Sequence, residues 1–223
     1  MRIVALTIAI SLVSITCDAH DFSWDNLLLS KMKIQKGFDY EAHVDSYMKV
    51  FRPVVWKRYQ NDEFELEDKR RETLSLMKDR VDAFSIEEEM ELNGTMTLGG
   101  YDFDKLEFPI KEATESHYWY KSRYTSSDFP SSFSIYFSNP ELIRTLPMGK
   151  EEARSFIARR KDRYGNVDRR VQMTLKFTVS KMKNERDEFL VEIKSARFYD
   201  DKGRTRLVHQ VTTPQRETAN IKR

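Results

Sequence analysis

Residues 171–179 read VQMTLKFTV, and their alternation of apolar and polar side chains indicates how this chain folds. A strand with this pattern buries one face and turns the other to water, which is typical of an antiparallel sheet. A second strand-like segment covers 189–199, and the turn at 200–203 (DDKG) leads to a third segment at 207–211. Three consecutive strands with short connections predict a three-stranded meander.

Shorter strand signals precede the meander. Apolar residues share one parity across 90–98, Gly99 and Gly100 break the run, and Tyr101 and Phe103 resume it on the other parity. This pattern predicts a strand, a bulge or bend, and a second strand. Aromatic and alternating content predicts further strands at 106–110, 117–124 and 132–137.

The part of the chain before these strands has the period of helices. Apolar residues recur at steps of three and four from 40 to 55, and Asp39 is placed to cap this helix. Pro53 either kinks the helix or opens a new one as its first-turn residue. A second stretch, 66–84, is apolar on one side and charged on the other, as expected of a solvated helix face. A further helix is predicted at 150–160.

Together these patterns predict an α+β fold in which N-terminal helices pack on a mostly antiparallel β-sheet that ends in the meander. We expect a single domain over 20–213, helical at 38–84 and mainly sheet at 88–212. The polar and basic segment 214–223 has almost no apolar residue, so we expect a disordered tail there.

The first residues have the pattern of a secretory signal peptide. Arg2 precedes a short apolar run at 3–15, and a small residue, Ala19, marks a cleavage step after residues 1–19. The run is shorter than the roughly 20 apolar residues that span a bilayer. The alternative is a lipoprotein signal in which Cys17 is lipidated, which the preceding Ser-Ile-Thr fits poorly. We therefore expect a periplasmic or secreted protein, with a lipid anchor through Cys17 as the alternative.

Composition narrows the classes of function. Cys17 is the only cysteine, so the mature protein is expected to be free of disulfides and of thiolate metal sites. A net charge of +2 with a third of the residues charged is an evenly mixed surface, which argues against a nucleic-acid partner. Only seven glycines argue against glycine-rich phosphate loops.

Four short motifs carry a resemblance to a known family. They are YMKVFRP at 47–53, NDEFE at 61–65, GGYDF at 99–103 and LPM at 146–148. In these motifs the chain resembles a family of uncharacterised secreted, periplasmic bacterial proteins of unknown function. The resemblance implies a bacterial, exported setting. That family has no assigned activity, so it transfers no catalytic residue.

Catalytic and metal motifs are missing from the sequence. The four histidines, His20, His43, His117 and His209, show no metal-like spacing, so we predict no metal site and no cofactor. No Gly-x-Ser-x-Gly nucleophile elbow is present. The carboxylates at 87–89, or at Asp102 and Asp104, could supply an acid and base pair for glycoside hydrolysis. Their positions are also those of solvent-facing turn and strand residues.

One local cluster of residues suggests a binding surface. In a strand at 117–124, His117, Trp119, Lys121 and Arg123 lie on one face, opposite three tyrosines. Such a basic aromatic strip suits stacking on a sugar ring or contact with an anionic patch. The alternative is cross-strand aromatic pairing with basic side chains that extend to water.

From these features we predict an exported bacterial envelope protein with a non-catalytic binding or interaction role. Its partner would be an envelope protein, a polymer or a small ligand, and it would have no transmembrane segment after cleavage. The alternative is a hydrolase of an envelope polymer whose carboxylates meet only in the fold. That activity would require a concave pocket with two or more titratable groups of perturbed pKa.

Overall fold

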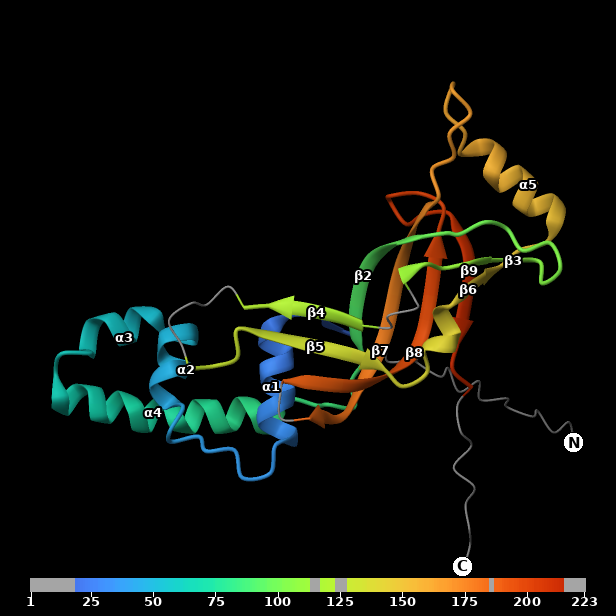
Figure 1. The fold of residues 1–223 in the computed structure, drawn as a ribbon. Coiled ribbons are helices and arrows are strands. Elements are labelled where there is room, and N and C mark those ends of the chain that lie inside the picture. The colour runs from blue at the N-terminus through green and yellow to red at the C-terminus, as the bar shows by residue number, and fades with distance from the viewer. Residues whose placement is uncertain (1–18, 113–116, 123–127, 185–186, 215–223) are drawn as a thin grey trace, which may run out of the picture.

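The computed structural model describes residues 19–112, 117–122, 128–184 and 187–214 (Figure 1). Most of the predicted leader (1–19) and tail (214–223) lies outside these ranges. The described residues form the predicted α+β fold: helices α2, α3 and α4 lie at one end, a curved sheet in the middle and α5 at the other end. No helix in these ranges has the length and apolar character needed to cross a membrane.

The meander is confirmed. It consists of β7 (Arg170–Asn184), β8 (Glu188–Tyr199) and β9 (Leu207–Thr212), and both neighbouring pairs are antiparallel. Val171, Met173 and Leu175 on β7 are fully buried, because they occupy the apolar parity seen in the sequence.

The rest of the main sheet is mixed. Its order is β1-β2-β7-β8-β5-β4, and β9 also pairs with β8. The β1–β2 and β5–β8 pairs are parallel and the others antiparallel, so the sheet is mostly antiparallel as predicted. The remaining strands are β1 (His20–Asp21), β2 (Met90–Thr97), β4 (His117–Lys121) and β5 (Ser132–Phe137).

Helix α1 (Trp24–Ile34) was not foreseen, since the predicted helical region began only at residue 38. Leu27, Leu28 and Leu29 are all buried, because α1 contacts both α4 (Glu63–Ala83) and the sheet strands β5 and β7. The sequence does contain a helical signal here, because Trp24, Leu27, Leu28 and Met32 follow the spacing i, i+3, i+4 and i+8.

Pro53 opens a new helix, which is the second of the two predicted outcomes. It is the first residue of α3 (Pro53–Tyr59), directly after α2 (Val44–Phe51). Asp39 does not cap α2. Its carboxylate accepts a hydrogen bond from the Ala42 N–H at 2.9 Å, in a turn that precedes the helix.

A second, two-stranded sheet lies beside α5 (Lys150–Arg159). Its strands are β3 (Glu107–Pro109) and β6 (Thr145–Pro147), and the 3-10 helix η2 (Pro140–Ile143) precedes β6. The strand predicted at Tyr101 and Phe103 is absent from this region. Asp102 instead accepts hydrogen bonds from the N–H groups of Asp104 and Lys105, both at 3.0 Å, and folds the chain into a turn.

Candidate functional site

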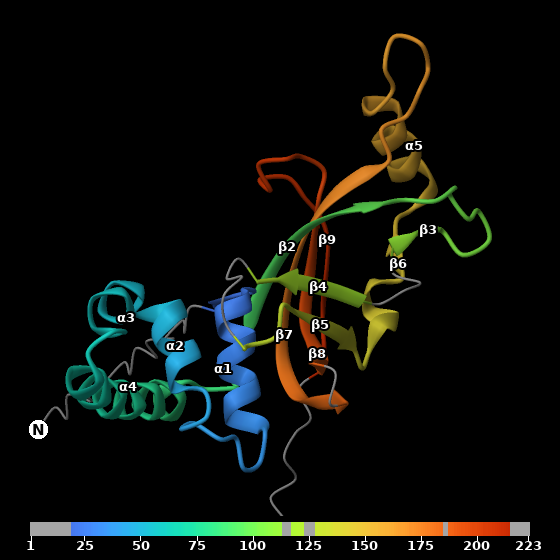
Figure 2. The same ribbon diagram turned by 60° about the vertical axis from the view of Figure 1, so that its left-hand side comes forward.

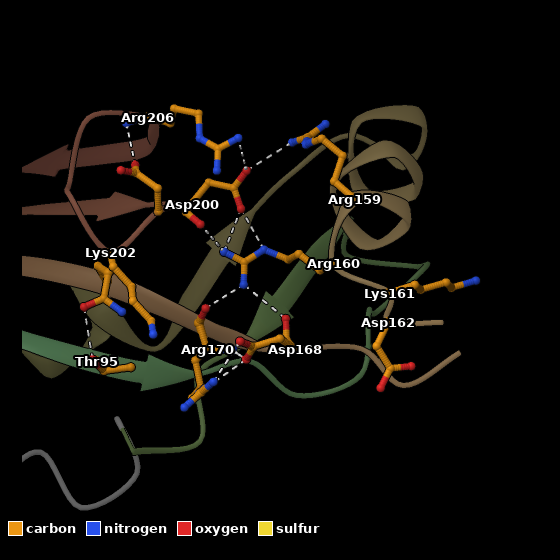
Figure 3. Close-up of a pocket in the computed structure, with 12 residues that line it drawn as sticks. Thr95, Arg159, Arg160, Lys161, Asp162, Asp168, Arg170, Asp200, Lys202 and Arg206 are labelled. Carbon is orange, nitrogen blue, oxygen red and sulfur yellow. Dashed lines mark hydrogen bonds and ion pairs between the residues drawn. The ribbon is translucent and has the colours of Figure 1, made fainter. Parts of the chain in front are cut away.

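A cleft of about 620 Å³ lies where the chain leaves α5, enters β7 and turns from β8 to β9 (Figure 3). Six of its twelve lining residues are basic and four are acidic, so the cleft carries an excess of positive charge. The basic residues are Arg159, Arg160, Lys161, Arg170, Lys202 and Arg206, and the acidic residues are Asp162, Asp168, Asp200 and Asp201.

The loop between α5 and β7 forms one wall of the cleft and has the shape of a short hairpin. Lys161 forms an isolated β-bridge with Val167. The Asp162 carboxylate accepts hydrogen bonds from the N–H groups of Tyr164 and Asn166, both at 2.8 Å. Gly165 has a φ of +87°, which a residue without a Cβ adopts readily. These local bonds give the wall a defined shape.

Asp200 and Arg160 form a buried ion pair at the base of the cleft. Arg160 Nε donates to Asp200 Oδ1 at 2.7 Å, and Nη2 donates to the Asp200 backbone carbonyl at 2.8 Å. Arg160 Nη1 donates to the carbonyl oxygens of Asp168 and Arg170. The two side chains are only 8% and 7% exposed. Arg160 therefore donates its hydrogen bonds to other groups of the protein, and these bonds connect the loop to the β8–β9 turn.

Two further guanidinium groups share the same carboxylate. Arg159 Nη2 lies 3.5 Å from Asp200 Oδ2, and Arg206 Nη1 lies 3.9 Å from that oxygen. Their side chains are 55% and 63% exposed. Each contact is long, so most of their donors face the water in the cleft.

The other carboxylates of the cleft are held in their charged form. A hydrogen bond from the Arg170 side chain lowers the pKa of Asp168 to about 2. The pKa of Asp162 is lowered by a hydrogen bond from the Asn166 side chain, and that of Asp201 by the Arg206 N–H. All three groups are therefore ionised acceptors at neutral pH.

A second hollow, of about 410 Å³, adjoins the cleft and shares Lys161 with it. It is an apolar groove between the turn at Tyr101 and Phe103, strand β3 and one side of α5. The Tyr101 hydroxyl donates to the Met148 carbonyl at 2.8 Å, so the GGYDF and LPM motifs meet at this groove.

Three residues of the predicted binding strip belong to β4, and no described side chain of β4 lines the cleft. Lys121 is exposed, whereas the side chains of His117 and Trp119 and the whole of Arg123 lie outside the described residues. On the opposite face of β4, Tyr120 is 41% exposed and its ring meets that of Phe22 edge-on. The strip therefore stays a prediction.

The three histidines whose side chains the structure describes have different partners. His20 Nε2 is 2.7 Å from the Glu88 carboxylate, His43 stacks on Phe129, and His209 stacks on Phe198. Burial lowers the pKa of His209. Within the described ranges, no group of three or more His, Cys, Asp or Glu side chains is arranged to hold a metal ion.

Asp102 and Asp104, considered above as a possible acid and base pair, lie in the turn that replaces the predicted strand. The Asp102 carboxylate accepts hydrogen bonds from backbone N–H groups there, and the bond from the Lys105 N–H lowers its pKa. Glu88 faces His20 instead of a second carboxylate.

The sequence reasoning missed the cleft. A signal was present, because eight of the thirteen residues from 158 to 170 (ARRKDRYGNVDRR) are charged. In the sequence alone, such a charged run predicts a solvent-exposed surface. Asp200 lies beside it only in the folded protein, where the chain reverses between β8 and β9.

The comparisons with known proteins identify a family but no activity. The model of a domain of unknown function (DUF4852) matches residues 39–159, from the turn before α2 to the end of α5. This match covers more than half of the chain and contains all four motifs quoted above. No curated protein and no solved structure matches the chain. The chain belongs to the DUF4852 family, whose function is unknown.

Proposed function

We propose that this protein is an exported, non-catalytic binding protein of the bacterial envelope, and that its charged cleft holds an anionic ligand. The leader pattern in residues 1–19 supports export, because a positive residue precedes a short apolar run and a small-residue cleavage step. The resemblance in the four motifs supports a bacterial setting. The ligand class follows from the cleft.

One observation carries the proposal for the ligand: three guanidinium groups surround the single carboxylate of Asp200. Arg160 is saturated by its partners, whereas Arg159 and Arg206 touch the carboxylate only at 3.5 and 3.9 Å. A guanidinium presents its donors as a planar fork that matches phosphate and carboxylate groups. The two exposed arginines can therefore hold an incoming oxyanion without losing the buried pair.

The carboxylates of the cleft favour binding over hydrolysis. A general acid needs a pKa raised toward the working pH. The pKa values of Asp162, Asp168 and Asp201 are lowered instead, because each accepts hydrogen bonds from neighbouring N–H groups. Asp168 orients the Arg170 side chain, whereas Asp162 and Asp201 hold the backbone of their own loops. All three are poorly suited to donate a proton to a glycosidic or phosphate ester oxygen.

The proposal is tested by titrating the full chain with inorganic pyrophosphate in an isothermal titration calorimeter at low salt. We expect binding that weakens as sodium chloride is added, since exposed charges are screened within about 10 Å at 0.1 M salt. Arg159→Gln and Arg206→Gln should each weaken binding about tenfold. That loss corresponds to about 1.4 kcal/mol, close to one charge-assisted hydrogen bond.

Arg71→Gln is the matched control for the loss of one positive charge. Arg71 lies on α4, is 71% exposed and contacts Glu67 and Asp68 on its own helix. If Arg71→Gln weakens pyrophosphate binding as much as the cleft variants do, the attraction is a property of the whole surface and the cleft is not the site. Absence of pyrophosphate binding would also contradict the proposal.

A further inference from the structure

The apolar groove beside the cleft has an aromatic floor. The ring centroids of Tyr101 and Phe103 are 5.0 Å apart and nearly perpendicular, and those of Tyr101 and Phe108 are 4.9 Å apart. Ala153 and Ile157 of α5 form the facing wall. A further aromatic ring can pack favourably against rings arranged in this way, because the face and the edge of an aromatic ring carry opposite partial charge.

Phe103 is held in the open by an ordered turn. Its side chain is 68% exposed. The turn beneath it is fixed by two hydrogen bonds to the Asp102 carboxylate and by backbone hydrogen bonds that Asp102 and Glu107 exchange. An exposed large apolar side chain contributes little to folding. The turn thus fixes the backbone position of Phe103, and its ring lines an apolar hollow of the kind that binds small molecules.

The charged residues that line the groove are all positively charged. Four of its ten lining residues are basic and none is acidic. Lys150 begins α5 and Arg154 follows one turn later, while Arg169 precedes β7 and donates to the Gly99 carbonyl at 2.6 Å. Glu151 pairs with Arg154 at 3.0 Å, but both side chains are more than two-thirds exposed, so this pair leaves the rim cationic.

The groove also belongs to the family domain. Eight of its ten lining residues fall within residues 39–159, and only Lys161 and Arg169 lie beyond. Of the twelve residues that line the charged cleft, only Thr95 and Arg159 fall within that range. The groove is therefore built almost entirely by the part of the chain that defines the family.

We propose that this groove binds a small aromatic carboxylate, with the ring against Phe103 and Tyr101 and the carboxylate at the cationic rim. The volume of about 410 Å³ suits a ligand of that size. Simple inorganic anions are disfavoured, because they make no favourable apolar contact with the aromatic floor. The basic rim disfavours aromatic cations by like-charge repulsion. This site adjoins the proposed anion site and shares Lys161 with it, but the observations that carry it do not include the arginines around Asp200.

The test compares two probes that carry the same ring and opposite charge. The full chain is titrated by calorimetry with indole-3-acetate and with tryptamine. We expect indole-3-acetate to bind at least tenfold more tightly than tryptamine. Phe103→Ala and the double variant Lys150→Gln/Arg154→Gln should each weaken indole-3-acetate binding at least tenfold, whereas Arg71→Gln should leave it unchanged.

Equal binding of the two probes, or no binding of either, would overturn the proposal. So would an unchanged affinity for indole-3-acetate in Phe103→Ala. Because the Phe103 ring is largely exposed, this variant should keep the far-ultraviolet circular dichroism spectrum of the parent. The double charge variant gives a second, independent readout on side chains that are themselves exposed.

Discussion

At Gly99 the backbone passes so close to Pro109 that a side chain has no room. The Gly99 N–H donates to the Pro109 carbonyl at 2.7 Å, where the end of β2 meets β3. A Cβ at Gly99 would lie 2.7 Å from Pro109 Cγ and 3.3 Å from its carbonyl oxygen. At Gly100 a Cβ would meet nothing within 4 Å. The two neighbouring glycines therefore have different roles.

Gly99→Ala should destabilise the protein by about 1–3 kcal/mol, because the rigid proline ring or the backbone must move to admit the methyl group. Gly100→Ala is the matched control and should change stability by less than about 0.5 kcal/mol. Urea unfolding followed by circular dichroism measures both. Equal effects of the two substitutions would contradict the close approach at Gly99.

The sequence predicted some of these residue-scale features and missed others. The break at Gly99 and Gly100 was visible because two adjacent glycines interrupt an alternating pattern. The turn at Asp102 was hidden, because Tyr101 and Phe103 continue that alternation. A short acidic side chain that hydrogen-bonds the next N–H groups competes with a strand, and here the turn prevailed.

Among the elements, α4 shows how one residue sets a helix boundary. The Asp62 side chain accepts a hydrogen bond from the Glu65 N–H at 3.1 Å, and its backbone carbonyl accepts from the Leu66 N–H at 2.8 Å. Glu63 and Glu65 add negative charge to the first turn, where the helix dipole favours it. The NDEFE motif thus contains the start signal of α4.

Asp62→Ala should lower the free energy of unfolding by about 1 kcal/mol, the usual contribution of an N-cap side chain. Asp68→Ala, on the same helix, is the control. Asp68 is 71% exposed and its contact with Arg71 is 3.8 Å long, so its loss should cost less than about 0.5 kcal/mol. Thermal or urea unfolding compares the two variants, and a larger loss in Asp68→Ala would refute the capping role.

The accuracy of the predicted elements varied. β5 has the bounds predicted from its alternation, and α5 differs from its prediction by one residue. The prediction missed α1, although Trp24, Leu27, Leu28 and Met32 follow the spacing i, i+3, i+4 and i+8 of a helix. Its contacts with both α4 and the sheet could be seen only in the tertiary structure.

On the scale of the molecule, the Arg160–Asp200 pair ties together segments that are 40 residues apart. It joins the loop after α5 to the β8–β9 turn, at the end of the molecule opposite α2, α3 and α4 (Figure 2). Asp200 is 7% exposed, so removing its charge leaves a buried guanidinium without a counter-ion. That loss is far more costly than the loss of a surface pair.

Asp200→Asn should therefore destabilise the protein by about 3–5 kcal/mol. Asp168→Asn is the control with the same change of charge. The Asp168 side chain is 50% exposed and pairs with the exposed Arg170, so its substitution should cost less than about 1 kcal/mol. Urea unfolding distinguishes them, and similar losses in both variants would show that the buried pair is not a structural tie.

The one-dimensional pattern was sufficient for the α+β class, the meander and most strand positions, because the alternation of side chains along a strand is a local property of the backbone. The tertiary structure alone brought Asp200 to Arg160, and Tyr101 to Met148. Both contacts join residues at least 40 positions apart, across chain reversals that no local period encodes. The charged cleft and the aromatic groove arise from such contacts, which is why the sequence predicted the framework but not the place where a ligand would bind.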